Sequence, residues 1–517
     1  MRAMSSTTAT AAADRSRLLF LGCFVSMVTT SFGFVLRTML IDEWGAQFNL
    51  TEVQKGEIFG VGLWPFAISI VLFSLVIDHI GYGKAMVFAF VCHVASAVLT
   101  ILAKNYWSLY VAMFLVALGN GAVEAVINPV IATVYRREKT KWLNILHAGW
   151  PAGLVLGGLL ALGMGTARWE YKIGLLLLPT IAYGLMLARC TFPVQERVAA
   201  GVSHREMLRE AGAVGAFIVV SLITAELGRV ARERGLIEWT WMHTLAVSIA
   251  VAGCFALWVQ SLGRFLFIVL LLLMIPLATT ELGTDSWITS LMQGEMKALD
   301  IDPVWVLIYT SSIMMVLRLF AGPIVHRLSP LGLLAVSSLL AAIGLVLLSR
   351  TAGVAIFAAA TVYGLGKTFF WPTMLGIVSE RFPKGGALTL NATGGVGMLS
   401  VGVVGTVFLG YWQDTRTAEL LQERQPAIYA EVVATKDSVL GHYQAVAPER
   451  VAALQDPAQR EAIKTVSAEA QKGALLNTAV FPLIMFVSYV LLAAYFRTKG
   501  GYGAEMLHIE PAERAAT

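Results

Sequence analysis

Long apolar stretches, each bounded by short polar segments, run through most of the chain. Six of them fall early in the sequence, at residues 18–40, 57–77, 84–103, 106–134, 142–164 and 170–190. Six more follow, at residues 265–292, 303–325, 331–349, 353–378, 388–412 and 475–496. A helix needs roughly 20 apolar residues to cross the hydrocarbon core of a bilayer. The pattern therefore predicts an all-α polytopic membrane protein made of two six-helix bundles.

The two bundles repeat one another in parallel. The segment SLVIDHIGYGK (74–84) after the second apolar run corresponds to GPIVHRLSP (322–330) in the second bundle, and Asn144 corresponds to Asn391. Matching loops of parallel repeats must lie on the same side of the membrane, so an even number of crossings separates them.

Two further apolar runs, at 211–228 and 239–263, lie between the bundles. The even-crossing rule requires that both cross the membrane or that neither does. We favour fourteen spans, and the alternative is twelve spans with a segment on the membrane surface. The predicted organisation is a cytoplasmic tail, a bundle, a central linker with two extra spans, a second bundle and a second tail, at residues 1–17, 18–192, 193–264, 265–497 and 498–517.

Composition excludes an ordinary soluble protein. Apolar residues make up 57% of the 517 residues and charged residues 14%, against about 45–50% and about 25% in soluble domains. The net charge of +5 is small, so we expect no nucleic-acid partner.

The cations gather in loops that would share one side of the membrane, including 136–141 and 189–209. Cytoplasmic loops are rich in Lys and Arg, so both termini are predicted to be cytoplasmic, in a plasma membrane of the bacterial inner-membrane type. The charged segment 413–474 would lie outside as short helices. We expect a monomer embedded in the lipid bilayer.

Motifs for catalysis and cofactor binding are absent from the sequence. It contains no phosphate-binding GxxxxGK[ST] loop, no Cys/His metal spacing and no GxSxG motif. We therefore predict that the protein is not an enzyme and binds neither a cofactor nor a metal.

Polar side chains inside the fourth apolar run are candidates for function. Asn120, Glu124 and Asn128 are spaced by four residues, so they share one face of a helix. An ionisable group at the centre of a bilayer costs at least about 2.5–3.5 kcal/mol and usually faces a partner or a cavity. We expect Glu124 to carry protons and the two asparagines to bind substrate hydroxyls; the alternative is a buried structural network.

The fifth and eleventh runs add polar groups that would line the same cavity. Asn144, His147 and Trp150 fall on roughly one helical face, and Asn391 is the repeat partner of Asn144. A lone histidine in a membrane helix is often only a hydrogen-bonded spacer, so we expect cavity lining by His147 rather than proton transfer.

The seventh run carries two carboxylates four residues apart, Glu281 and Asp285, followed by Trp287. Neighbouring carboxylates in a medium of low dielectric constant repel, so one of them tends to hold a proton. This pair is a second candidate for proton coupling, with Trp287 as a substrate contact. Asp285 can also be read as a solvated helix end.

Lys367 is the least expected residue, because a lysine in the middle of an apolar run needs an anion. Its partner is predicted to be Glu124, Glu281 or an acidic substrate. Trp371 follows four residues later and would either bind the apolar face of a sugar or pack within the bundle.

Four segments resemble the major facilitator superfamily, and within it the fucose–proton symporter family: GNGAVEAVINP (119–129), TELGTDSWI (280–288), RLFAGPIVHRLSP (318–330) and WPTMLG (371–376). The resemblance implies two bundles that work by alternating access. Asp78 and Arg327 in the loops after corresponding spans, and Arg318 just before the second loop motif, are the predicted gating residues. The family carries a proton-coupling acid in its first span, whereas SMVTTSFGFVLRTML (26–40) contains Arg37 and no acid.

The predicted function is secondary active transport, namely proton-coupled symport of a small polar solute, most plausibly a sugar. The alternatives are a drug or organic-anion proton antiporter and a membrane sensor that does not transport.

Overall fold

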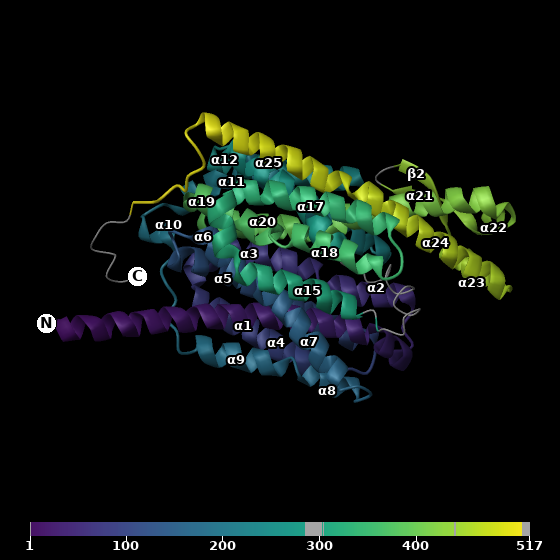
Figure 1. Cartoon of the computed structure of the whole chain (residues 1–517), viewed down its shortest axis with the longest axis horizontal. Coiled ribbons are helices and arrows are strands. Elements are labelled where there is room, and N and C mark those ends of the chain that lie inside the picture. Colours follow the sequence, from purple (N-terminus) through teal and green to yellow (C-terminus); the bar gives the residue numbers. More distant parts are fainter. Residues whose placement is uncertain (1, 285–301, 303, 439–440, 509–517) are drawn as a thin grey trace.

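The computed structural model describes residues 2–284, 302, 304–438 and 441–508, and most of them are helical. Within these residues, twelve helices are long and apolar enough to cross a membrane, and a helix pair bent by 68° adds a thirteenth. Figure 1 shows the helices side by side along the long axis, with both chain termini at one end of the bundle. We call this the terminal end and the opposite one the distal end. The predicted all-α polytopic fold is confirmed.

The first six apolar runs form nine helices, because three of the runs are interrupted. The helices are α1 (Arg2–Phe48), α2 (Glu52–Val61), α3 (Trp64–Ile80), α4 (Tyr82–Ile101), α5 (Tyr106–Val134), α6 (Lys139–Leu146), α7 (Gly149–Gly163), α8 (Trp169–Gly174) and α9 (Leu177–Leu187). We refer to these helices together as the N-terminal half.

The last six apolar runs are interrupted in the same way and form the C-terminal half. Its elements are α13 (Phe265–Ala278), the π-helix η1 (Thr279–Gly283), α15 (Val304–Leu319), α16 (Ala321–Leu328), α17 (Pro330–Arg350), α18 (Ala355–Lys367), α19 (Phe370–Arg381), the 3₁₀ turn η2 (Pro383–Gly385), α20 (Gly386–Ser400), the π-helix η3 (Val401–Gly405), α21 (Thr406–Arg424), α24 (Pro457–Thr478) and α25 (Val480–Thr498).

Prolines explain four of the interruptions. A proline ring clashes with the carbonyl four residues earlier and offers no N–H to it, so a helix tends to break there. The four pairs are Val61 with Pro65, His147 with Pro151, Leu319 with Pro323 and Thr368 with Pro372, and a helix ends at or within a residue of the first member of each.

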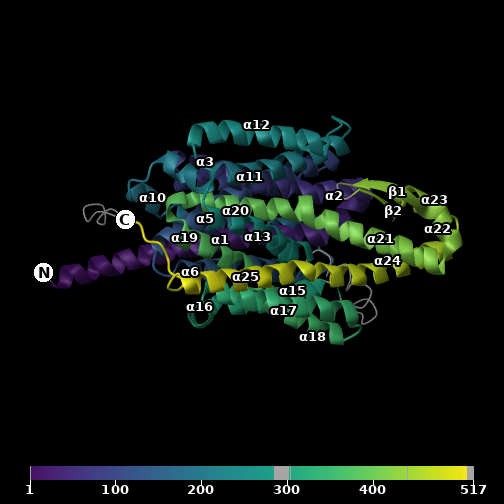
Figure 2. The same ribbon diagram turned by 90° about the horizontal axis from the view of Figure 1, so that it is seen from above.

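The two central apolar runs are both helices of spanning length. After the short α10 (Glu196–Ala199), α11 (His204–Glu233) and α12 (Trp241–Val259) pass the length and hydropathy test for a membrane span. Figure 2 shows α12 at the edge of the molecule, running along the bundle with α11 between it and the rest. Only 17% of an apolar 18-residue stretch of α12 is buried within the protein, so most of that helix would face lipid. This arrangement favours the prediction of two extra spans over a segment on the membrane surface.

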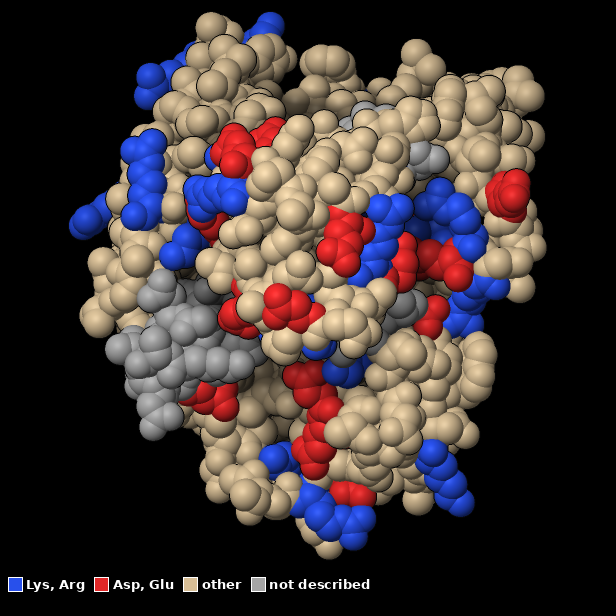
Figure 3. All heavy atoms as spheres, turned by 90° about the vertical axis from the view of Figure 1, so that its right-hand side faces the viewer, with Lys and Arg blue, Asp and Glu red and all other residues tan. Residues whose placement is uncertain are grey.

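A small folded unit covers part of the distal end (Figure 1). It contains the distal parts of α21 and α24, the helices α22 (Pro426–Val432) and α23 (Pro448–Ala453), and an antiparallel hairpin of β1 (Val433–Ser438) and β2 (Gly441–Val446). Leu421, Val432 and Ile463 belong to its own apolar core. Figure 3 looks onto the distal end and shows acidic and basic side chains interspersed there.

The hairpin corrects the expectation that 413–474 contains helices alone. The Ala, Glu and Gln content of the segment favours helices, but β-branched and aromatic residues such as Val433, Thr435, Tyr443 and Val446 favour strands. The position of this unit opposite the termini agrees with the predicted topology (Figure 1).

The two halves pack closely along α7 with α15, α3 with α20, and α6 with α19. Small residues permit this approach. A Cβ atom added at Gly376 of α19 would lie 2.4 Å from Oγ1 of Thr140, and one at Gly395 of α20 would lie 2.6 Å from Cγ2 of Val71. Any larger side chain at these glycines would push the halves apart.

Candidate functional site

The polar face predicted on the fourth span lies inside the protein. Asn120, Glu124 and Asn128 of α5 are all buried. The Asn128 amide donates a hydrogen bond to the Glu124 carboxylate at 2.5 Å, and its carbonyl oxygen lies 2.9 Å from Nε2 of His147. His147 occupies the break between α6 and α7. The structure therefore joins Glu124, Asn128 and His147 in one hydrogen-bonded chain.

Arg318 extends this chain into the C-terminal half. Its Nη1 donates to the His147 carbonyl at 3.0 Å and its Nε donates to the Thr368 carbonyl at 2.6 Å. These two carbonyls are the ones that Pro151 and Pro372 deprive of a helical N–H partner. Arg318, which is predicted as a gating residue, is a buried bridge between proline breaks in the two halves.

Arg318 also neutralises Glu281. Its Nη2 lies 2.8 Å from the Glu281 carboxylate, and the backbone N–H of Trp371 donates to the other carboxylate oxygen at 3.1 Å. Glu281 belongs to the π-helix η1, a type of irregularity that occurs frequently at functional sites. The structure thus connects Glu124 to Glu281 through Asn128, His147 and Arg318.

Lys367 is buried at the end of α18. Its Nζ lies 5.4 Å from the centroid of the Tyr363 ring, and the Tyr363 hydroxyl donates to the carbonyl of Thr280. Glu124 forms no ion pair with any residue that the structure describes, so the predicted Glu124–Lys367 pair is not formed. Asp285 and Trp287 lie outside the described residues.

The repeat-related asparagines play equivalent parts. Asn144 of α6 donates to the Thr373 hydroxyl of α19 at 3.2 Å, and Asn391 of α20 donates to the Ala125 carbonyl of α5 at 3.1 Å. Each asparagine therefore reaches from its own half to the other. The predicted cavity residues Asn144 and Asn391 sit at the contact between the halves in this conformation.

Asn120 belongs to a second buried chain, which the sequence did not reveal. Its carbonyl oxygen lies 2.9 Å from Nε2 of His93, and Nδ1 of His93 lies 3.0 Å from the Tyr183 hydroxyl. A lone histidine inside the third apolar run was the available signal. Asn120 also lines a small pocket with Trp150, which packs against Phe34 at 6.0 Å between ring centroids.

Arg37 of α1 lines the same pocket and was also missed as a candidate. Its guanidinium lies 5.3 Å from the Phe34 ring and 4.7 Å from the Phe59 ring. Only 4% of the residue is exposed, and its Nε has no hydrogen-bond partner among the described residues. The available signal in the sequence was a cation within the first apolar run.

Ion pairs and hydrogen bonds hold the two halves together at the terminal end. Lys139 of α6 contacts Glu196 at 2.7 Å and the Ser379 carbonyl of α19 at 3.0 Å. The Thr140 hydroxyl donates to Glu380 of α19 at 2.6 Å. We call these contacts the terminal-end lock.

The C-terminal segment packs beside the terminal-end lock. The Tyr502 hydroxyl donates to Glu380 at 2.7 Å, and Glu505 contacts Arg264 and Arg381 at 3.0 Å each. Partial burial raises the pKa of the Glu505 carboxyl, but the two guanidinium groups outweigh burial and hold the pKa below its ordinary value.

The other two predicted gating residues differ in their surroundings. Asp78 forms a nearly buried ion pair with Arg197 of α10. Arg327 is exposed and makes no ion pair with a described residue. Its neighbour His326 lies 3.3 Å from Glu138 of the N-terminal half.

The described residues contain no cluster of three or more His, Cys, Asp or Glu side chains able to hold a metal ion. The polar groups described above are instead buried amides, carboxylates and cations spread over both halves. Such an arrangement can bind a small polar solute and exchange protons, but it lacks an activated nucleophile.

Three solved structures with a similar fold are membrane transporters. The Escherichia coli fucose:proton symporter FucP is 14% identical, with a TM-score of 0.58 over 92% of this chain and 97% of its own. The human organic anion transporter MFSD10 is 11% identical, with a TM-score of 0.58 over 92% and 98%. The E. coli proton:xylose symporter XylE is 12% identical, with a TM-score of 0.58 over 92% and 96%.

Comparison with curated protein sequences gave no significant match. The sequence profile of the Major Facilitator Superfamily, however, matches residues 18–407, which is most of the chain. The predictions of a transporter and of a protein that is not an enzyme are therefore confirmed, and the chain belongs to the Major Facilitator Superfamily.

Proposed function

We propose that the protein is a proton-coupled symporter of a small polyhydroxylated solute and works by alternating access between its two halves. The observation that carries this proposal is the buried chain from Glu124 through Asn128, His147 and Arg318 to Glu281. It links a carboxylate in each half through groups that can rearrange when the halves move.

The two carboxylates have different roles because their surroundings differ. Glu281 has a guanidinium at 2.8 Å, so it can stay ionised in the protein. Glu124 has an amide at 2.5 Å and no cation among the described residues. A buried carboxylate without a cation is costly unless it takes up a proton, so Glu124 is the proton carrier and Glu281 positions Arg318.

The surrounding side chains fit a hydroxylated solute. Small-molecule sites combine apolar walls with a few placed polar groups, and Asn120, Asn128, Trp150 and Trp371 supply amides and indoles. The transporters with similar structures are named for different kinds of substrate, namely fucose, organic anions and xylose. The fold alone therefore does not identify the solute.

The proposed orientation places the terminal end in the cytoplasm, as the distribution of Lys and Arg predicts. Proton loading from the distal side would then favour opening of the terminal-end lock. Loss of the proton to the cytoplasm would return the empty transporter to the conformation that is open on the distal side.

The substitution Glu124→Gln tests this proposal. In proteoliposomes it should abolish uptake driven by a pH gradient while leaving solute exchange, because glutamine resembles protonated glutamate but cannot release a proton. Glu43→Gln, the same change at an exposed position near the distal end of α1, is the matched control and should behave as wild type. Proton-driven accumulation by Glu124→Gln would show that another group carries the proton.

A further inference from the structure

Arg37 is a buried cation that takes no part in the proposed proton pathway. Its side chain is buried, yet the described residues offer it two aromatic rings and no carboxylate. Aromatic rings attract a cation by about 0.5–2 kcal/mol, whereas an isolated charge in a medium of low dielectric constant costs far more. A cation placed in this way is suited to an anion that arrives from outside the protein.

The pocket beside Arg37 has the chemistry of a site for a hydroxylated acid. Thr30, Asn120 and Trp150 line it together with the guanidinium. A guanidinium binds a carboxylate through two parallel hydrogen bonds, and the hydroxyl and amide groups can bind solute hydroxyls. The unpartnered Nε of Arg37 supplies one of the required donors.

In this conformation the pocket is closed, with a volume of about 10 Å³, roughly enough for one water molecule. The short helix α2 ends directly before Gly62 and Leu63, which line the pocket. Its Phe59 ring lies against Arg37, and a Cβ atom at Gly62, directly after α2, would overlap the guanidinium. Because α2 is separated from α3 at this point, it can move without displacing the whole span.

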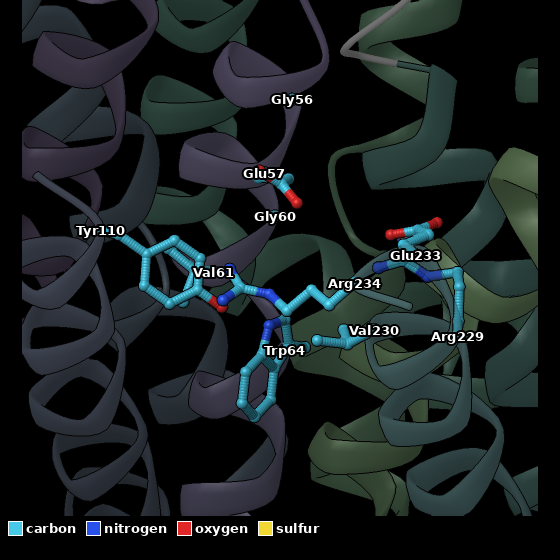
Figure 4. A pocket seen from close by; sticks show the side chains of 10 residues that line it. All are labelled: Gly56, Glu57, Gly60, Val61, Trp64, Tyr110, Arg229, Val230, Glu233 and Arg234. Atoms are coloured by element: carbon cyan, nitrogen blue, oxygen red, sulfur yellow. The ribbon is translucent and has the colours of Figure 1, made fainter. Parts of the chain in front are cut away.

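Space for this movement exists on the other face of α2. A cavity of about 290 Å³ separates α2 from α11, lined by Gly56, Glu57 and Gly60 on one side and by Arg229 and Arg234 on the other (Figure 4). Helix α2 is held in its present position by a hydrogen bond of Glu57. The Tyr106 hydroxyl donates to Glu57 at 2.7 Å and accepts from Arg234, directly after α11, at 3.1 Å.

We propose that the transported solute is a polyhydroxylated carboxylic acid, of the sugar-acid class, and that Arg37 binds its carboxylate beneath α2. This inference rests on the proposed transport function and specifies its substrate. A monoanion carried with one proton adds no net charge, so such transport would not respond to membrane potential.

Binding to purified full-length protein in detergent tests the inference. The probes are paired compounds of equal ring structure, D-glucuronate with D-glucose and D-galacturonate with D-galactose, and the measurement is the ligand-induced rise in melting temperature. We expect at least one acid, and not its neutral partner, to stabilise the wild type. Arg37→Gln should weaken that binding by about 10–100-fold, the loss of a charged hydrogen-bonded contact.

Two further variants make the result specific. Arg37→Lys keeps the positive charge and should retain more of the acid binding than Arg37→Gln, which also guards against misfolding of the glutamine variant. Lys104→Gln removes an exposed cation at the distal end and should bind as wild type. The inference is overturned if neither acid stabilises the wild type, or if Arg37→Gln and Arg37→Lys both bind the acid with wild-type affinity.

The inference and the proposed function fail in different ways. Arg37-dependent acid binding without proton-driven uptake would leave the anion site standing and remove proton symport. Proton-driven uptake of a neutral sugar that Arg37→Gln leaves unchanged would keep symport and remove the anion site.

Discussion

Breaking the buried ion pair between Arg318 and Glu281 should destabilise the protein far more than breaking an exposed pair of the same type. The N···O distance is 2.8 Å, with side-chain exposures of 2% and 4%. Removing one partner of a buried pair costs about 3–5 kcal/mol, because an uncompensated charge remains. Arg318→Gln should therefore lower the free energy of unfolding by about that amount.

The distal unit provides a matched control. Arg424 and Glu469 approach to 2.6 Å, but their side chains are 51% and 48% exposed. Exposed pairs contribute about 0.2–1 kcal/mol, so Arg424→Gln should have little effect. Since the two pairs share residue types and similar distances, burial is the main difference between them.

Reversible unfolding by sodium dodecyl sulfate in mixed micelles, followed by circular dichroism, gives the free energies. The double variant Arg318→Gln/Glu281→Gln should be more stable than Arg318→Gln alone, because it no longer buries a carboxylate whose guanidinium partner has been removed. A loss of less than 1 kcal/mol for Arg318→Gln, the range of exposed pairs, would refute the reasoning. A double variant less stable than either single variant would do the same.

Two predictions concern contacts at the terminal end. Glu380→Gln replaces the carboxylate that accepts hydrogen bonds from Thr140 and Tyr502 with a neutral amide. The terminal end should therefore open more often, which would appear as a longer distance between spin labels at Arg137→Cys and Arg327→Cys. An unchanged distance distribution would contradict this. The folded state lowers the pKa of Glu505, so its ionised carboxylate stabilises the docked C-terminal segment above the ordinary pKa of 4.5. This stabilisation is lost as the pH falls through the pKa that Glu505 has in the folded state. A spin label at Met506→Cys should thus gain mobility in acid below pH 4.5, and Glu505→Gln should show that mobility already at pH 7; equal mobility of the two proteins at pH 7 would count against the ion pairs.

Much of the fold followed from simple patterns in the chain. Apolar runs located the spans, including the two central runs that the structure contains as α11 and α12. The four-residue spacing of Asn120, Glu124 and Asn128 predicted their shared face. These features depend on local periodicity, so a single sequence is enough to find them.

The contacts between distant residues could not be predicted in the same way. Arg318 lies close to the repeat motif in the sequence, whereas its partners His147 and Glu281 come from other spans. Which carboxylate meets which cation depends on helix rotation and on breaks such as those before Pro151 and Pro372. Sequence separation carries no information about these geometries.

The proton-coupling claim is tested most directly by recording solute and proton movement together. Proteoliposomes containing the wild type or Glu124→Gln are mixed with a transported solute identified by counterflow, in a weakly buffered medium with an external pH electrode. Proton symport predicts that the medium becomes alkaline as the solute enters through the wild type, and that Glu124→Gln exchanges solute without a pH change. Acidification of the medium, or wild-type uptake with no pH change, would contradict proton symport.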